Sequence, residues 1–342
     1  MVGDIGRVAK PTPLGSLAPP LMSEGGMQFT TLGRTGLRVS VAGLGCGGFS
    51  RLGLGRGKTE AEAIAVVHAA LECGVNLIDT AAAYGTEEVV GRALAGRRDG
   101  VVLATKAMVR EGARALSGAE VVASLEASLT RLGTDRVELF QLHAVLPREY
   151  GHVMAEIVPA LLRARDEGKI RHIGITETAP NDHAHDTLVR ALDHEVWETF
   201  MVAFNMMHTN ARDTVFARTK AQGVGTLLMF AVRNVFSQAE RLAEEMRALV
   251  AAGTLSAEVG ADPLGFLLHD GGASSLIDAA YRFVRHEPGV DVVLFGTSDI
   301  GHLSANVASI LKPPLPAADQ AMLRARFGHL VGVGLDGPKV AG

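Results

Sequence analysis

The sequence predicts an α/β fold, a (β/α)8 TIM barrel preceded by a short β-hairpin. Short apolar runs alternate with helical patterns along the chain, and eight such runs occur. Alternation of this kind implies βαβ units and a parallel sheet. The runs are almost entirely apolar, as a sheet buried on both faces requires. Eight units match a closed barrel; a doubly wound open sheet is the competing fold, because periodicity does not report closure.

The predicted barrel follows a proline-rich segment and a hairpin. Four prolines and several glycines interrupt residues 1–26, and we expect a flexible tail there. Residues 27–342 are expected to form a single barrel domain. Its first element is a hairpin with strands Gln28–Leu32 and Leu37–Ser40, joined by a glycine-containing turn.

The order of the remaining elements follows from the apolar periodicity. The expected barrel strands are Val41–Leu44, Asn76–Asp79, Val101–Lys106, Val137–His143, His172–Thr176, Thr199–Phe204, Thr226–Phe230 and Val292–Phe295. The expected helices are Thr59–Cys73, Glu87–Leu94, Gly118–Leu132, His152–Glu167, Asp182–Leu192, Asp213–Ala221, Gln238–Ala252, Ser274–Arg285, Ile300–Ile310 and Ala317–Phe327.

Composition argues against several classes of protein. The net charge is −4 and no block of Lys or Arg occurs, so we expect neither a nucleic-acid nor a membrane partner. Two cysteines are too few for a disulfide framework. No apolar run approaches the roughly 20 residues of a membrane span. We therefore expect a cytoplasmic protein; its oligomeric state stays open.

Polar residues stand at the carboxyl ends of the predicted strands, on the face that holds the active site of a barrel. They are Asp79, Lys106, His143, Thr176 and Glu177. Tyr84, one of three tyrosines, follows Asp79 by five positions. Charges placed after apolar runs are costly unless they are paired, so these side chains are expected to interact.

Together these side chains suit the transfer of a proton to a carbonyl oxygen. A phenol with a pKa of about 10 is a weak acid at neutral pH, and a nearby ammonium favours its ionised form. Asp79 would hold Lys106 beside Tyr84, and His143 would orient the carbonyl. A purely structural Asp79–Lys106 pair and a Schiff base on Lys106 are alternative interpretations.

Six segments resemble one known family: Thr31–Ser40, Asn76–Gly85, Ala104–Lys106, Val137–His143, Gly168–Ile175 and Phe295–Asn306. Across about residues 28–327 the chain is similar to the aldo-keto reductases. The resemblance implies that Tyr84 is the general acid/base, that Lys106 tunes it, that Asp79 positions Lys106, and that His143 orients the substrate. It implies hydride exchange between a nicotinamide and a small carbonyl or alcohol substrate, an aldehyde, ketone or sugar.

The same resemblance implies a cofactor extended across the carboxyl face of the barrel. The residues expected to bind it are Thr176, Glu177, Phe230, Gly296, Thr297, Ser298, His302 and Asn306. Family prevalence favours NADP. The loop after the last strand has no Lys or Arg and carries Asp299, which favours NAD, so both cofactors stay open.

Departures from the family pattern leave a third function open. Thr176 and Glu177 replace the usual Ser-Asn pair, and Val202 replaces a Gln, so the nicotinamide end is remodelled. A cofactor-binding or sensing barrel with little turnover is therefore an alternative. His183 and His185 are two positions apart and would not face each other on a helix, so no metal site is expected.

Overall fold

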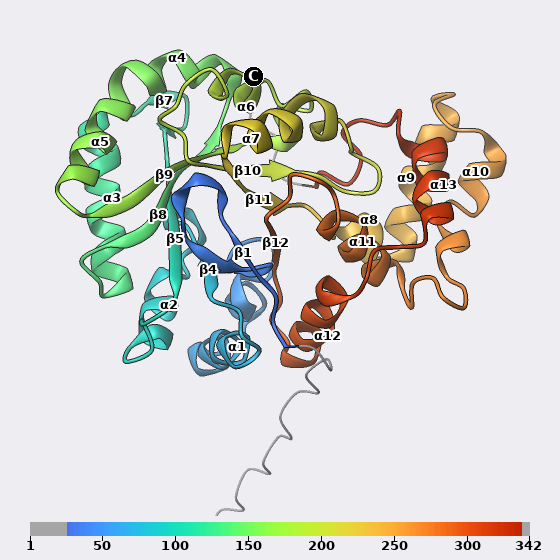
Figure 1. The fold of residues 1–342 in the computed structure, drawn as a ribbon, viewed down its shortest axis with the longest axis horizontal. Helices are drawn as coiled ribbons and strands as arrows, with labels where there is room; N and C mark the ends of the chain where they lie inside the picture. The colour runs from blue at the N-terminus through green and yellow to red at the C-terminus, as the bar shows by residue number, and fades with distance from the viewer. Residues whose placement is uncertain (1–25, 337–342) are drawn as a thin grey trace, which may run out of the picture.

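The computed structural model describes residues 26–336 and contains a closed parallel barrel (Figure 1). Its strands are β3 (Ala42–Gly45), β4 (Leu77–Asp79), β5 (Val102–Met108), β8 (Val137–Val145), β9 (Ile170–Glu177), β10 (Thr199–Ala203), β11 (Gly225–Met229) and β12 (Val292–Phe295). Each strand pairs in parallel with the next of these, and β12 pairs with β3. The predicted barrel is confirmed, and the open sheet is excluded.

The predicted hairpin is also present, and it covers the amino end of the barrel. β1 (Phe29–Thr31) pairs antiparallel with β2 (Arg38–Ser40). Buried Leu32 packs so closely on Gly225, at the start of β11, that a Cβ there would lie 2.7 Å from the leucine Cγ. Arg34 donates to backbone carbonyl oxygens on the same side, including that of Trp197 at 2.8 Å. The amino end of the barrel is therefore covered by the chain's own hairpin.

Helices follow the strands as expected. They are α1 (Glu60–Glu72), α2 (Glu87–Leu94), α3 (Gly118–Leu132), α4 (Tyr150–His152) with α5 (Val158–Asp166), α6 (Asp186–Ala191), α7 (Ala217–Gln222), α9 (Ala239–Ala251), α11 (Leu276–Arg285), α12 (Ile300–Leu311) and α13 (Ala317–Phe327). Thr59 and Ser117 form capping boxes that fix the starts of α1 and α3. The short β6 (Arg110–Glu111), β7 (Arg114–Ala115), α8 (Asn234–Ser237) and α10 (Ala257–Ala261) were not expected.

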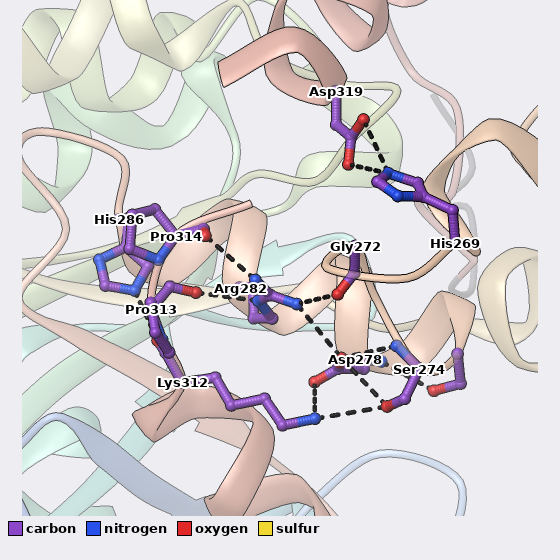
Figure 2. A network of polar contacts seen from close by, with 11 residues as sticks. His269, Gly272, Ser274, Asp278, Arg282, His286, Lys312, Pro313, Pro314 and Asp319 are labelled. Atoms are coloured by element: carbon purple, nitrogen blue, oxygen red, sulfur yellow. Dashed lines mark hydrogen bonds and ion pairs between the residues drawn. The ribbon is translucent and has the colours of Figure 1, made fainter. Parts of the chain in front are cut away.

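A polar network fastens the last helices together (Figure 2). From α11, Arg282 donates to the carbonyl oxygens of Pro313, Pro314 and Gly272 at 2.9, 3.1 and 2.8 Å. Asp278, one turn earlier, accepts from Lys312 at 3.0 Å. The connection between α12 and α13 is thereby held against α11. Figure 1 places α9, α10 and α13 together at one side of the barrel.

The predicted tail and the predicted domain bounds extend beyond residues 26–336. The expected tail, residues 1–26, lies outside the described residues except for Gly26, and the single-domain assignment of residues 27–342 stays a prediction. Within residues 26–336, no helix is both long enough and apolar enough to cross a membrane.

Candidate active site

A buried ion pair stands at the centre of the carboxyl face. Lys106 Nζ donates to Asp79 Oδ2 at 2.7 Å and to the Thr80 carbonyl oxygen at 2.9 Å. The two charged side chains are 0% and 4% exposed. Gln141 Nε2 donates to the other carboxylate oxygen at 3.2 Å. Neighbouring strands β4, β5 and β8 supply these residues, so the register of the barrel fixes the pair.

Tyr84 lies over this pair on a short turn, η3 (Ala82–Tyr84). Lys106 Nζ is 4.9 Å from the centre of the phenol ring. On another side, a Cβ on Gly47 would lie 2.5 Å from Tyr84 Cε2, so the ring occupies the space above a glycine in the loop after β3. The phenol is therefore held between a cation and a side-chain-free stretch of backbone.

His143 completes the group that the sequence predicts. Its Nε2 is 3.4 Å from Tyr84 Oη, and the two rings meet edge to face. The pairing of β8 with β9 shifts register between Leu142 and Val145, and Ala144 has a φ of 53°. Such a bulge redirects a strand's side chains, and here it is at the histidine. Among the described residues, His143 Nδ1 has no hydrogen-bond partner.

Burial and charge set the protonation of the group. Burial raises the pKa of the Tyr84 phenol above its ordinary value, although Lys106 opposes the rise. Burial alone would lower the pKa of Lys106, but Asp79 and Tyr84 raise it. Burial, with help from Lys106 and Arg110, lowers the pKa of His143 to about 3. The expected lowering by lysine is thus present but smaller than the effect of burial, so at neutral pH Tyr84 is a protonated phenol and His143 a neutral imidazole.

The residues after β9 are engaged within the protein. Thr176 Oγ1 accepts from the Ala144 amide at 2.7 Å. Glu177 Oε2 is 2.7 Å from His185 Nδ1, and its Oε1 accepts from the Ala203 amide at 2.8 Å. Both carboxylate oxygens of Glu177 therefore have protein partners, and a contact of Thr176 or Glu177 with the cofactor stays a prediction.

An arginine joins two loops at the same end of the barrel. The Arg233 guanidinium lies 4.5 Å from the centre of the Phe230 ring and 4.9 Å from that of Phe49. It also donates to the Asp336 carbonyl oxygen. Phe230 has a φ of 66°, a left-handed conformation that is strained for a bulky side chain. The loops after β3 and β11 thus meet through stacked side chains.

The loop after β12 leads into α12. Thr297 Oγ1 accepts from the Asp299 amide at 3.1 Å, and Asp299 Oδ1 accepts from the His302 amide at 2.8 Å, capping the helix. Gly296 and His302 are exposed, Ser298 is half-buried, and Asn306 is half-buried one turn further along α12. Thr297 is buried. Contacts of all five residues with a cofactor stay predictions.

Sequence reasoning missed several neighbours of the site. Gln141 supports Asp79, but an interior strand residue carries no distinguishing pattern. The glycine-rich run from Gly43 to Gly48 suggests a loop that a ligand can approach closely, but nothing in the sequence places Gly47 against the Tyr84 ring. Lys58, which donates to the Ser298 carbonyl oxygen at 2.6 Å, is 240 positions away in the chain. The alternation of charged and apolar residues gives no signal for such distant contacts.

Comparison with known proteins identifies the family. The family model described as "Aldo/keto reductase family" matches residues 43–326. This chain is an aldo-keto reductase family member.

Its relatives agree with that assignment. The aldo-keto reductase YhdN of Bacillus subtilis is 29% identical over 310 residues, which cover 82% of this chain and 87% of the relative. L-galactose dehydrogenase of Arabidopsis thaliana is 31% identical over 212 residues, covering 59% and 64% of the two chains. The structure of aldo-keto reductase AKR11C1 from Bacillus halodurans in its holo form has a TM-score of 0.67 and 26% identity, covering 87% of this chain and 96% of that one.

Members of the family are oxidoreductases that act on carbonyl compounds with NAD(P)H. The carboxyl face of this barrel fits such a cofactor in its stretches of glycine backbone. Gly45 ends β3, and Gly296 directly follows β12; a Cβ built on Gly296 would lie 3.3 Å from the Gly45 carbonyl oxygen. A Cβ built on Gly48, in the loop after β3, would have no atom within 4 Å. Backbone without side chains permits close approach of an extended ligand.

Proposed function

We propose that this aldo-keto reductase interconverts a carbonyl and an alcohol with Tyr84 as the proton donor and acceptor. One observation carries the proposal: a protonated phenol lies 3.4 Å from a neutral imidazole and against a buried ammonium. A nicotinamide bound nearby would supply the hydride. The residues proposed to hold it are Thr176, Glu177, Phe230, Gly296, Thr297, Ser298, His302 and Asn306.

Each side chain of the group has a distinct task in reduction. Tyr84 donates its proton to the oxygen of the substrate as negative charge develops there. The His143 imidazole lies beside the phenol hydroxyl, where an N–H could hydrogen-bond the same oxygen; which nitrogen carries the proton depends on the tautomer. Lys106 stabilises the phenolate that remains, and Asp79 fixes the lysine. In alcohol oxidation the proton moves in the opposite direction.

Lys106 is a poor candidate for a Schiff base. An amine must lose its proton to attack a carbonyl. Here Asp79 raises the pKa of Lys106 against the effect of burial, and the ammonium is fully buried with two oxygen partners. We therefore favour hydride transfer over a lyase reaction.

The substrate class is proposed as aldehydes, ketones or sugars. A similar relative is named L-galactose dehydrogenase, which makes sugars a sensible part of a first screen. The buried Glu177–His185 pair favours a second candidate, a cofactor-binding protein with little turnover, because Glu177 replaces a residue that holds the carboxamide in the family.

The test is a turnover screen with NADPH and NADH against aldehydes, ketones and sugars, followed through nicotinamide absorbance. The proposal expects turnover in the wild type that depends on Tyr84. Cofactor binding without turnover on any substrate would support the sensing protein. Borohydride trapping of substrate on Lys106, without nicotinamide oxidation, would support the lyase.

A further inference from the structure

Ala144, the residue after His143, has an unusual backbone conformation. Its φ is 53°, in the left-handed region that residues other than glycine rarely adopt. It lies in the bulge between Leu142 and Val145, where the pairing of β8 with β9 shifts register. Left-handed backbone is unfavourable for alanine, so the surrounding structure must hold it there. His143 directly precedes Ala144, so the conformation held at Ala144 also sets the direction of the imidazole.

Side chains from two other elements bind both backbone polar groups of Ala144. Its amide donates to Thr176 Oγ1, near the end of β9, at 2.7 Å. Its carbonyl oxygen accepts from Arg110 Nη1 at 2.8 Å. Arg110 lies in β6, part of the short hairpin after β5 that the apolar periodicity does not predict. The strained residue beside His143 is therefore held on both sides.

Arg110 is itself fixed and paired. Its side chain is 7% exposed, and the same Nη1 donates to Glu149 Oε2 at 2.8 Å. That carboxylate oxygen also accepts from the Leu146 amide at 2.9 Å, which ties it to the backbone just after β8. A buried guanidinium is costly without such a partner. Burial, then the charges of Lys106 and Arg110, lower the pKa of His143, so the arginine also favours the neutral imidazole.

We propose that Arg110 is a positioning residue for the reaction, acting through the Ala144 carbonyl to hold His143 beside Tyr84. Without the guanidinium, Ala144 can relax toward an ordinary φ. That relaxation turns the neighbouring imidazole away from Tyr84 Oη, which lies 3.4 Å from its Nε2. Displacing a group that acts in the transition state slows the chemical step more than it weakens binding. This inference rests on the proposed function, because it needs a reaction in which Tyr84 and His143 act together.

The test measures steady-state kinetics with the carbonyl compound that the wild type reduces fastest in the screen. Arg110→Met removes the donor and keeps the space filled, and Arg110→Lys keeps a charged donor. Arg114→Gln changes an exposed arginine of the same hairpin and is the matched control for charge. Adding Ala144→Gly to Arg110→Met is the rescue variant, because glycine adopts a positive φ without being held there.

We expect Arg110→Met to lower kcat by about 10-fold or more, with substrate KM and the cofactor dissociation constant within about 2-fold of wild type. Arg110→Lys should retain more kcat than Arg110→Met. Adding Ala144→Gly to Arg110→Met should restore kcat by about 3-fold or more. Arg114→Gln should resemble the wild type in kcat and KM. A residue that only stabilises the fold would give no such recovery on changing Ala144.

Wild-type kcat in Arg110→Met, an equal loss in Arg114→Gln, or no recovery on adding Ala144→Gly overturns the inference. The proposed function survives that result if Tyr84→Phe has lost turnover. Urea denaturation shows whether each variant folds. If Arg110→Met does not fold, Glu149→Gln takes its place: it weakens the anchor of the guanidinium and should lower kcat by about 3-fold, and unchanged kcat there overturns the inference. Absence of turnover in the wild type on the whole screen overturns both.

Discussion

Replacing Lys106 by methionine tests how much the buried Asp79–Lys106 ion pair contributes to the free energy of unfolding. The replacement has similar length, so the space stays filled, but Asp79 loses the ammonium 2.7 Å away and retains Gln141 at 3.2 Å. Removing one partner of a buried ion pair costs about 3–5 kcal/mol, because the other charge is left without compensation. We expect Lys106→Met to lower the free energy of unfolding by that amount at neutral pH.

The pH dependence of this loss has a defined sign. Burial raises the pKa of Asp79, and Lys106 opposes that rise in the wild type. In Lys106→Met the opposition is gone, so the folded pKa lies further above the unfolded one. The penalty is therefore absent below the unfolded pKa of about 4 and grows as pH rises through the folded pKa. Relative to wild type, the variant should be least destabilised in acid.

A second substitution tests whether the buried carboxylate is the cause. Adding Asp79→Asn to Lys106→Met removes the charge with little change of shape, and should restore about 2 kcal/mol or more at neutral pH. Urea denaturation followed by circular dichroism measures both variants. Equal unfolding free energies for the single and double variants at neutral pH would refute the reasoning. Turnover should be lost in both, whatever their stability.

Three further predictions concern acid–base behaviour, packing and scaffold. Burial raises the pKa of Tyr84 and lowers that of His143 to about 3. The kcat/KM for reduction should therefore be level from mild acid through neutral pH and fall only above about pH 10. A fall in kcat/KM centred near neutral pH would contradict this. Gly47→Ala would place a Cβ 2.5 Å from the Tyr84 ring, so kcat/KM should drop on the order of 10- to 100-fold while the protein stays folded. Gly151→Ala, where a Cβ meets open space, is the control and should leave kcat/KM unchanged. Arg282→Met removes donors to three carbonyl oxygens and should cost about 2–4 kcal/mol in urea denaturation with kcat/KM unchanged; wild-type stability would show that the network is dispensable.

The barrel and the catalytic group could be predicted because each leaves a local pattern. Apolar runs of strand length mark the sheet, and a charged residue such as Asp79 or Lys106 at the end of such a run is conspicuous. Parallel strands bring their carboxyl ends to one face, so neighbouring strands imply neighbouring side chains. The hairpin turn likewise has its own composition, with Gly33 and Gly36.

What could not be predicted depends on contacts between distant segments or on burial. The absence of Lys and Arg after β12 favours NAD in the sequence, yet Lys58 reaches that loop from 240 positions away. Glu177 has the position of an amide-binding residue, but its buried partner His185 is defined only by the folded loops. The net direction of the Tyr84 pKa depends on desolvation, which composition and spacing do not report.

The most direct measurement is a single-turnover experiment on Tyr84→Phe with the preferred cofactor and a substrate from the screen. The phenylalanine retains the ring over Gly47 and removes only the hydroxyl. The account predicts that the rate of hydride transfer falls by about 100-fold or more, while the cofactor dissociation constant measured by fluorescence stays the same. A variant that reduces substrate at the wild-type rate would contradict the role of the phenol.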